Sequence, residues 1–158
     1  MKRIIGIILI ICLAFSIVGC DKKKDEDETP AQNADDVVIK VSQTEVLVGG
    51  TITFKITLNN VKGVKSLAIR PEMDTESFET VSARPLVNGL IADGSNGIVT
   101  VVFSESTDMN DTTVAEFTVK AKTVGTNLAV AFSVSVMDAN DNKIAINQTD
   151  SIFVNVKY

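Results

Sequence analysis

The stretch TITFKITL, residues Thr51–Leu58, alternates polar and apolar side chains without a break. Successive side chains of a β-strand point to opposite faces, so this pattern predicts a strand with one buried and one outward face. The buried face would carry Ile52, Phe54, Ile56 and Leu58, and the outward face Thr51, Thr53, Lys55 and Thr57.

The same alternation extends over much of the chain after residue 36. It is equally regular in Thr113–Ala121, Asn127–Val136 and Ser151–Val156, and weaker in Val37–Ser42, Ser66–Glu72, Phe78–Ser82, Leu86–Ile91 and Ile98–Ser104. Turn-forming Gly, Asn and Asp residues separate these segments, and no later window has a helical period. Residues 37–158 are therefore predicted to form one all-β domain, an antiparallel β-sandwich with jelly-roll topology and about nine strands.

The first 19 residues have the pattern of an export signal. Lys2 and Arg3 precede an almost wholly apolar run, which ends at Ile17-Val18-Gly19-Cys20. This tetrapeptide resembles the bacterial lipobox, in which the cysteine thiol receives a diacylglycerol before cleavage. The resemblance implies an exported protein, lipid-anchored through Cys20 to the outer face of the cell membrane; an uncleaved N-terminal anchor is the alternative.

Residues 20–36 contain the lipidated cysteine and a highly charged stretch with no large apolar residue. Such a composition cannot bury enough surface to order itself, so a disordered spacer is expected. Lys22–Lys24 could contact anionic headgroups next to the anchor, or simply be solvated.

Composition excludes several function classes. The chain has no histidine, and its two cysteines are Cys12 and Cys20, so the domain has no disulfide, no transition-metal site and no His- or Cys-based catalysis. With 20 acidic against 15 basic residues, nucleic acid is not an expected partner. No cofactor is indicated.

Several motifs follow one another at a family-like spacing: Val48–Phe54, Leu58–Val64, Leu67–Asp74, Phe78-Glu79, Phe103–Ser106, Val114–Lys120, Asp138–Ile144 and Ile152–Val156. Their order resembles that of the cohesin domain, the module that binds dockerins in cellulosomes. The resemblance covers Val37–Tyr158, with departures at Pro71, at Met73 and at Asp150-Ser151. It implies a nine-stranded jelly roll that binds a dockerin-like protein, with a carbohydrate-binding module of similar fold as the related alternative.

One face of the expected sandwich is a candidate binding surface. If the apolar residues of three strands point inward, small side chains and one arginine point outward: Ser66, Ala68, Arg70, Thr100, Val102, Ala129, Ala131, Ser133 and Ser135. In cohesins the corresponding sheet receives dockerin, and a flat patch of this kind could accept a helical partner. Ser66 and Ala68 stand where several cellulosomal cohesins carry Asn and Asp, which argues against a standard dockerin. An ordinary solvated sheet face is the alternative.

No group of residues supports catalysis. Ser104-Glu105-Ser106 has no basic partner nearby, and Asp74, Glu76 and Glu79 are more typical of a solvated edge than of a glycosidase carboxylate pair. Asp138, Asn140 and Asn142 form a weak candidate calcium site, although the same residue types make hairpin turns without a metal.

The sequence therefore favours a non-catalytic cell-surface lipoprotein that binds a protein partner or anchors an extracellular assembly. The first alternative is a module that holds polysaccharide near the cell. Sugar platforms usually contain stacked aromatic rings, and this chain has no Trp and only Tyr158 as tyrosine. The second alternative is a structural envelope lipoprotein.

Overall fold

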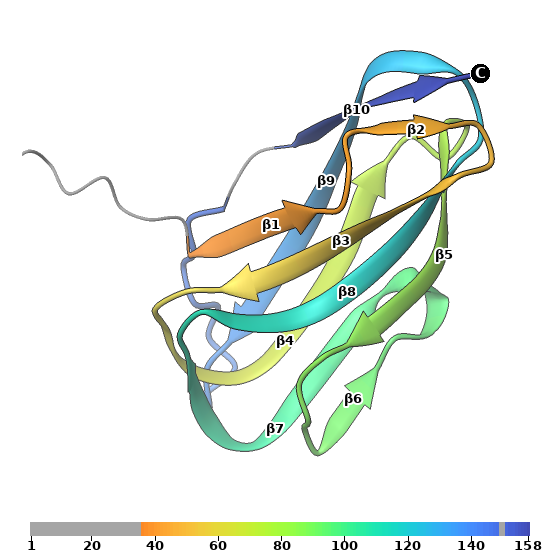
Figure 1. Cartoon of the computed structure of the whole chain (residues 1–158). Helices are drawn as coiled ribbons and strands as arrows, with labels where there is room; N and C mark the ends of the chain where they lie inside the picture. Colours follow the sequence, from red (N-terminus) through yellow and green to blue (C-terminus); the bar gives the residue numbers. More distant parts are fainter. Residues whose placement is uncertain (1–35, 149–150) are drawn as a thin grey trace, which may run out of the picture. The chain divides into compact units, whose positions relative to one another are not determined.

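Two β-sheets lie face to face in the computed structural model, which describes residues 36–148 and 151–158 (Figure 1). The predicted signal sequence, the lipidation of Cys20 and most of the spacer lie outside the described residues. Within the described part of the chain, no helix has the length and apolar character needed to cross a bilayer.

The smaller sheet has four antiparallel strands in the order β1-β3-β8-β5 (Figure 1). They are β1 (Val37–Val41), β3 (Thr51–Leu58), β8 (Thr112–Ala121) and β5 (Phe78–Pro85). The strand TITFKITL is thus central, with one neighbour on each side. We call the solvent side of this layer the four-stranded face.

The larger sheet has the order β2-β10-β9-β4-β7-β6. Its strands are β2 (Glu45–Leu47), β10 (Ile152–Lys157), β9 (Gly125–Met137), β4 (Val61–Met73), β7 (Val99–Met109) and β6 (Ile91–Asp93). Only β2 and β10 run parallel. A 3₁₀ turn, η2 (Ser95–Gly97), joins β6 to β7. The predicted all-β sandwich is confirmed, with ten strands among the described residues instead of nine.

The core lies between the sheets and consists mainly of Val, Ile and Phe side chains. Phe132 of β9 contacts Phe54 of β3 and Phe117 of β8, with ring centroids 5.4 and 5.1 Å apart. All three rings are at most 1% exposed. No cysteine lies among the described residues, so this packing, and not a cross-link, holds the two layers together.

The predicted strand at Leu86–Ile91 is wrong. Leu86–Leu90 form a loop, and strand β6 begins only at Ile91. The side chains of Leu90 and Ile91 are 74% and 53% exposed, so their apolar character does not reflect burial in the core. Gly89 lies so close to β7 that a Cβ atom there would be 2.6 Å from the Val102 carbonyl oxygen.

Thr57 pairs with the half-buried Val38 on the outward side of β3, as the alternation predicts, but it is itself buried. The register of β3 on β8 shifts after Ile56, and the bulge leaves both Val114 and Ala115 fully buried. Thr57 is only 1% exposed, and its hydroxyl lies 3.1 Å from that of Thr113. This hydrogen bond satisfies the buried hydroxyl, so a threonine is tolerated at this buried position.

Candidate partner-binding face

The outward side of β9, β4 and β7 brings all nine predicted face residues onto one surface. Ser66 pairs with Val102 on one side and Met137 on the other, and Ala68 pairs with Thr100 and Ser135. Arg70 lies opposite Ser133. Ala131 lies opposite Glu72 one step further along, and Ala129 comes next on β9. We call this surface the six-stranded face.

Small side chains make the centre of the six-stranded face flat. Ala68 and its two cross-strand neighbours Thr100 and Ser135 are half-buried, although no other element covers them among the described residues. On a sheet, neighbouring side chains shield one another, and short ones leave little relief. A partner could therefore approach the backbone of β4 closely.

One end of the face is charged. The Arg70 guanidinium is 3.6 Å from the Glu72 carboxylate, and both side chains are more than half exposed. An exposed ion pair of this kind contributes little to stability, so both groups can exchange this contact for one with a partner. Glu72 was left out of the predicted face, although it follows Arg70 by two residues within the predicted strand Ser66–Glu72.

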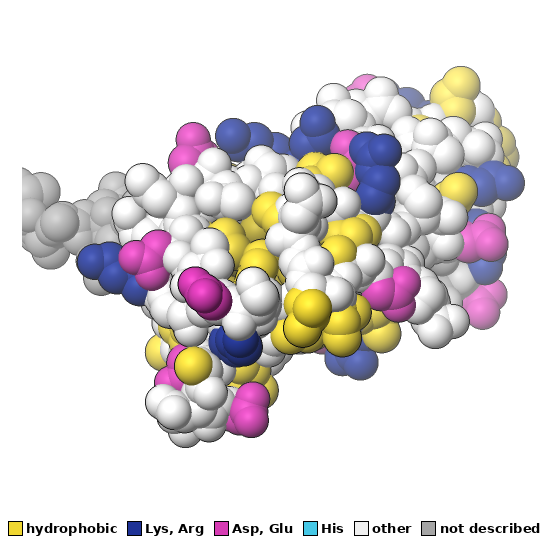
Figure 2. All heavy atoms as spheres, turned by 90° about the horizontal axis from the view of Figure 1, so that it is seen from below, with side chains coloured by type: hydrophobic (Ala, Val, Ile, Leu, Met, Phe, Trp, Pro, Cys, Tyr) yellow, Lys and Arg dark blue, Asp and Glu magenta, His cyan; other side chains and the backbone are white. Residues whose placement is uncertain are grey.

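The other margin of the face carries one exposed apolar side chain and one acidic side chain. Ile91 of β6 lies opposite Val102, and Asp93 lies opposite Thr100, so β6 continues the surface beyond β7. The sequence prediction missed both residues because the pairing of β6 with β7 depends on a loop, not on a local pattern. In the space-filling view, hydrophobic side chains gather in the middle of the visible side, with charged groups around them (Figure 2).

A hollow of about 560 Å³ borders the face next to β9. It forms because β10 pairs with β9 only as far as Val130, after which residues 143–148 run beside β9 instead. The Gln148 side chain donates a hydrogen bond to the Phe132 carbonyl at its floor. Glu72, Ser133 and Lys143 line it, so its polar groups adjoin the predicted face.

The candidate calcium residues form a hydrogen-bonded turn after β9. One Asp138 carboxylate oxygen accepts bonds from the backbone amides of Asn140 and Asn142, at 2.8 and 2.9 Å, and the other accepts the Asn142 side-chain amide at 3.2 Å. These bonds, led by that from the Asn142 backbone, hold the pKa of Asp138 below its usual value of 3.8. The carboxylate therefore serves as the turn's own acceptor.

A lowered pKa in the folded state means that the ionised Asp138 stabilises the fold above pH 3.8, and that this stabilisation is lost as the pH falls further. Asp138→Asn keeps a turn-forming side chain but removes the charge. We expect the variant's Tm to lie below that of the parent at pH 7, and the difference to shrink below pH 3.8. Calorimetry across this range measures it, with Asp141→Asn as a control in the same turn. A difference independent of pH would contradict this assignment.

Of the carboxylates considered for glycosidase chemistry, Asp74 and Glu76 lie in the turn between β4 and β5, whereas Glu79 lies on β5 itself. Asp74 accepts hydrogen bonds from the Ser77 hydroxyl at 2.6 Å and from the Glu76 amide at 3.0 Å. The Ser77 bond, with the Glu76 bond next, lowers the pKa of Asp74, whereas a general acid needs a raised one. In residues 36–148 and 151–158, no three acidic, His or Cys side chains converge as metal ligands would.

No family model matches the chain, and no curated protein matches it in sequence. Solved structures, however, resemble it in fold. A cohesin module of a family 33 glycoside hydrolase from Clostridium perfringens superimposes with a TM-score of 0.62 at 15% identity, covering 77% of this chain and 96% of that one.

Two further structures show the same likeness. A non-cellulosomal cohesin from Archaeoglobus fulgidus gives a TM-score of 0.58 at 13% identity, covering 79% of this chain and 93% of its own. A type I cohesin in complex with a dockerin, from Clostridium thermocellum, gives 0.54 at 13% identity, covering 78% and 96%. The domain described here therefore has the fold of cohesin modules.

Proposed function

We propose that this protein is a non-catalytic, lipid-anchored module that binds a protein partner through the six-stranded face. The observation that carries the proposal is the flat centre around Ala68, between a charged end at Arg70–Glu72 and a margin with the exposed apolar side chain of Ile91. Large, nearly flat surfaces with a few protruding anchors are typical of protein interfaces, whereas catalysis and small-ligand binding favour concave sites.

The partner class we propose is a dockerin-like module. One of the structural neighbours is a cohesin bound to a dockerin, which makes this class the first to test. The hydrogen-bonding side chains differ, because Ser66 and Ala68 are shorter than the Asn and Asp of several cellulosomal cohesins. We therefore propose a dockerin-like partner that packs closely over small residues and contacts Arg70, not one selected by an Asn–Asp pair.

The location we propose is the outer face of the cell membrane, through lipid on Cys20. The supporting observation is the basic, apolar and small-residue order of residues 2–20, which ends in a cysteine. Two or three acyl chains on one residue form a durable anchor, since each buried methylene contributes about 0.8 kcal/mol. Labelling with a radioactive fatty acid, lost in Cys20→Ser, tests this part separately.

Arg70→Glu should weaken binding of a dockerin-like partner roughly tenfold or more, because it replaces an attractive contact with a repulsive one at the edge of the interface. The chain from residue 21 onward, immobilised on a biosensor, would be tested against the dockerin modules encoded in the same genome. Thermal stability should hardly change, because the Arg70 side chain is 63% exposed.

Lys120→Glu is the matched control, since it reverses an exposed cation on the opposite sheet. It should bind like the parent. Equal affinities of the Arg70 variant and the parent for every bound dockerin would refute the proposed face. Retention on insoluble polysaccharide, without binding to any dockerin, would replace the proposal with the carbohydrate-binding alternative.

A further inference from the structure

Cations line up across the four-stranded face, on the side of the domain away from the proposed partner site. The register pairs Lys40 of β1 with Lys55 of β3, Lys55 with Glu116 of β8, and Glu116 with Arg84 of β5. One row therefore crosses all four strands and carries three positive groups and one negative group. Lys120 lies on the same face, between Thr51 and Glu79.

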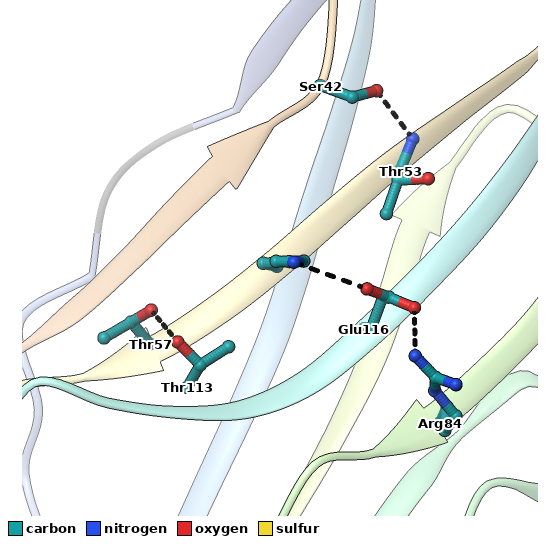
Figure 3. Close-up of polar contacts among 7 residues, drawn as sticks. Ser42, Thr53, Thr57, Arg84, Thr113 and Glu116 are labelled. Atoms are coloured by element: carbon teal, nitrogen blue, oxygen red, sulfur yellow. Dashed lines mark hydrogen bonds and ion pairs between the residues drawn. The ribbon is translucent and has the colours of Figure 1, made fainter.

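Glu116 holds part of this row in place. Its two oxygens lie 3.7 Å from the Lys55 ammonium and 2.8 Å from the Arg84 guanidinium (Figure 3). Lys40 and Lys120 are exposed, and neither forms an ion pair with any described residue. Lys and Arg side chains follow one another along the upper edge of the space-filling view (Figure 2).

The neighbouring positions on the face are short hydroxyl residues. Thr53, Thr118 and Ser82 lie opposite one another in the next row. Because these side chains are short, the ammonium and guanidinium groups project beyond them, and the hydroxyls can donate hydrogen bonds to an anion that the cations hold.

The charge on this face is opposite to that of the domain. The described residues contain 10 Lys and Arg against 13 Asp and Glu, whereas this face carries four cations, Lys40, Lys55, Arg84 and Lys120, against Glu79 and Glu116. A flat cationic surface on an otherwise acidic domain is suited to binding a flat anionic surface.

We propose that the four-stranded face docks on anionic phospholipid headgroups of the membrane that carries the anchor, an inference that rests on the proposed lipidation of Cys20. The spacer enters the domain at β1, the edge strand of this sheet and the strand of Lys40. The chain from Cys20 to Val37 spans at most about 60 Å when fully extended, so the row stays within reach of the bilayer. Docking would leave the six-stranded face pointing outward, toward a partner.

The test uses a fragment of residues 21–158, whose Ala34–Tyr158 unit has its own core. A hexahistidine tag tethers it to vesicles containing nickel-chelating lipid, and a single dye is placed through Ser82→Cys on the four-stranded face or Ser66→Cys on the six-stranded face. Quenching by brominated lipid reports proximity. We expect phosphatidylglycerol to increase quenching of the Ser82 dye but not of the Ser66 dye, and high salt to reverse it.

Two double variants test whether this row of cations is responsible for binding to anionic vesicles. Lys40→Glu with Lys120→Glu leaves the Glu116 ion pairs intact and should weaken sedimentation of the untagged fragment with anionic vesicles roughly tenfold. Lys62→Glu with Lys143→Glu, the same charge change elsewhere, should have a much smaller effect. Equal quenching of both dyes, equal loss in both double variants, or binding to an anionic polysaccharide but not to vesicles would overturn the proposal. No outcome depends on lipidation or on a dockerin, so failure here leaves the proposed function intact.

Discussion

Replacing Phe132 with alanine should lower the free energy of unfolding by about 3–5 kcal/mol. Phe132 is the ring of the six-stranded sheet that meets both Phe54 and Phe117 of the other sheet, and it is 1% exposed. Its loss opens a cavity at the contact between the layers. Domains of this size are stable by about 5–15 kcal/mol, so the variant would lose a large part of the total. Urea unfolding followed by circular dichroism measures the change.

Two further variants distinguish the destabilisation caused by the cavity from any effect of losing an aromatic ring as such. Phe153 lies on β10, in the same sheet, but is 58% exposed, so Phe153→Ala should change stability by no more than about 0.5 kcal/mol. Phe132→Leu keeps most of the volume and should cost about 1–2 kcal/mol. Similar losses for Phe132→Ala and Phe153→Ala would mean that the two layers do not meet at Phe132.

The largest expected effect on binding comes from Ala68→Arg. Ala68 lies at the centre of the six-stranded face, between Thr100 and Ser135. A long charged side chain there holds a closely packed partner away from β4 and displaces the contacts around it. Because central contacts carry most of the energy of an interface, we expect affinity to fall about 100-fold or more. Isothermal titration calorimetry with the dockerin identified by the biosensor measures it.

Thr118→Arg is the control for Ala68→Arg. Thr118 lies on β8 in the middle of the other sheet and is likewise half-buried with an outward side chain. The two variants should have similar stability, because each places a charged arginine side chain on the outward face of a sheet. If Thr118→Arg reduced affinity as much as Ala68→Arg did, the partner would not be specific to the six-stranded face.

The sequence predicted the central strands well because burial leaves a clear local signal there. The alternation of Thr51–Leu58 and of Asn127–Val136 reflects one side packed against the other sheet, and the inward residues from Val130 to Val136 are at most 7% exposed. Alternation also fixes which residues share a face. Placing Ser66, Ala68 and Arg70 together needed no knowledge of the pairing partners.

The edge strands of the six-stranded sheet could not be predicted from alternation. Strand β2 has three residues and β6 has three, too short to show a period, and β6 is exposed throughout. Leu90 and Ile91 are apolar without being buried, so hydrophobicity misplaced the strand by several residues. The burial of Thr57 depends on its neighbours Val38 in β1 and Thr113 in β8, which only the pairing of distant segments specifies.

The charged row on the four-stranded face was likewise hidden from local patterns. Lys40, Lys55, Glu116 and Arg84 are separated by up to 76 positions in the chain, yet they form one row across four strands. Each residue alone is an ordinary outward charge of an alternating strand. The row that they form becomes visible only when the strand order is known.

Hydrogen–deuterium exchange of the domain with and without a bound dockerin tests the central claim most directly. Binding through the six-stranded face predicts slower exchange in β4, β7 and β9, with β3 and β8 unchanged. Protection confined to β3 and β8, or to the loops at one end of the sandwich, would contradict it.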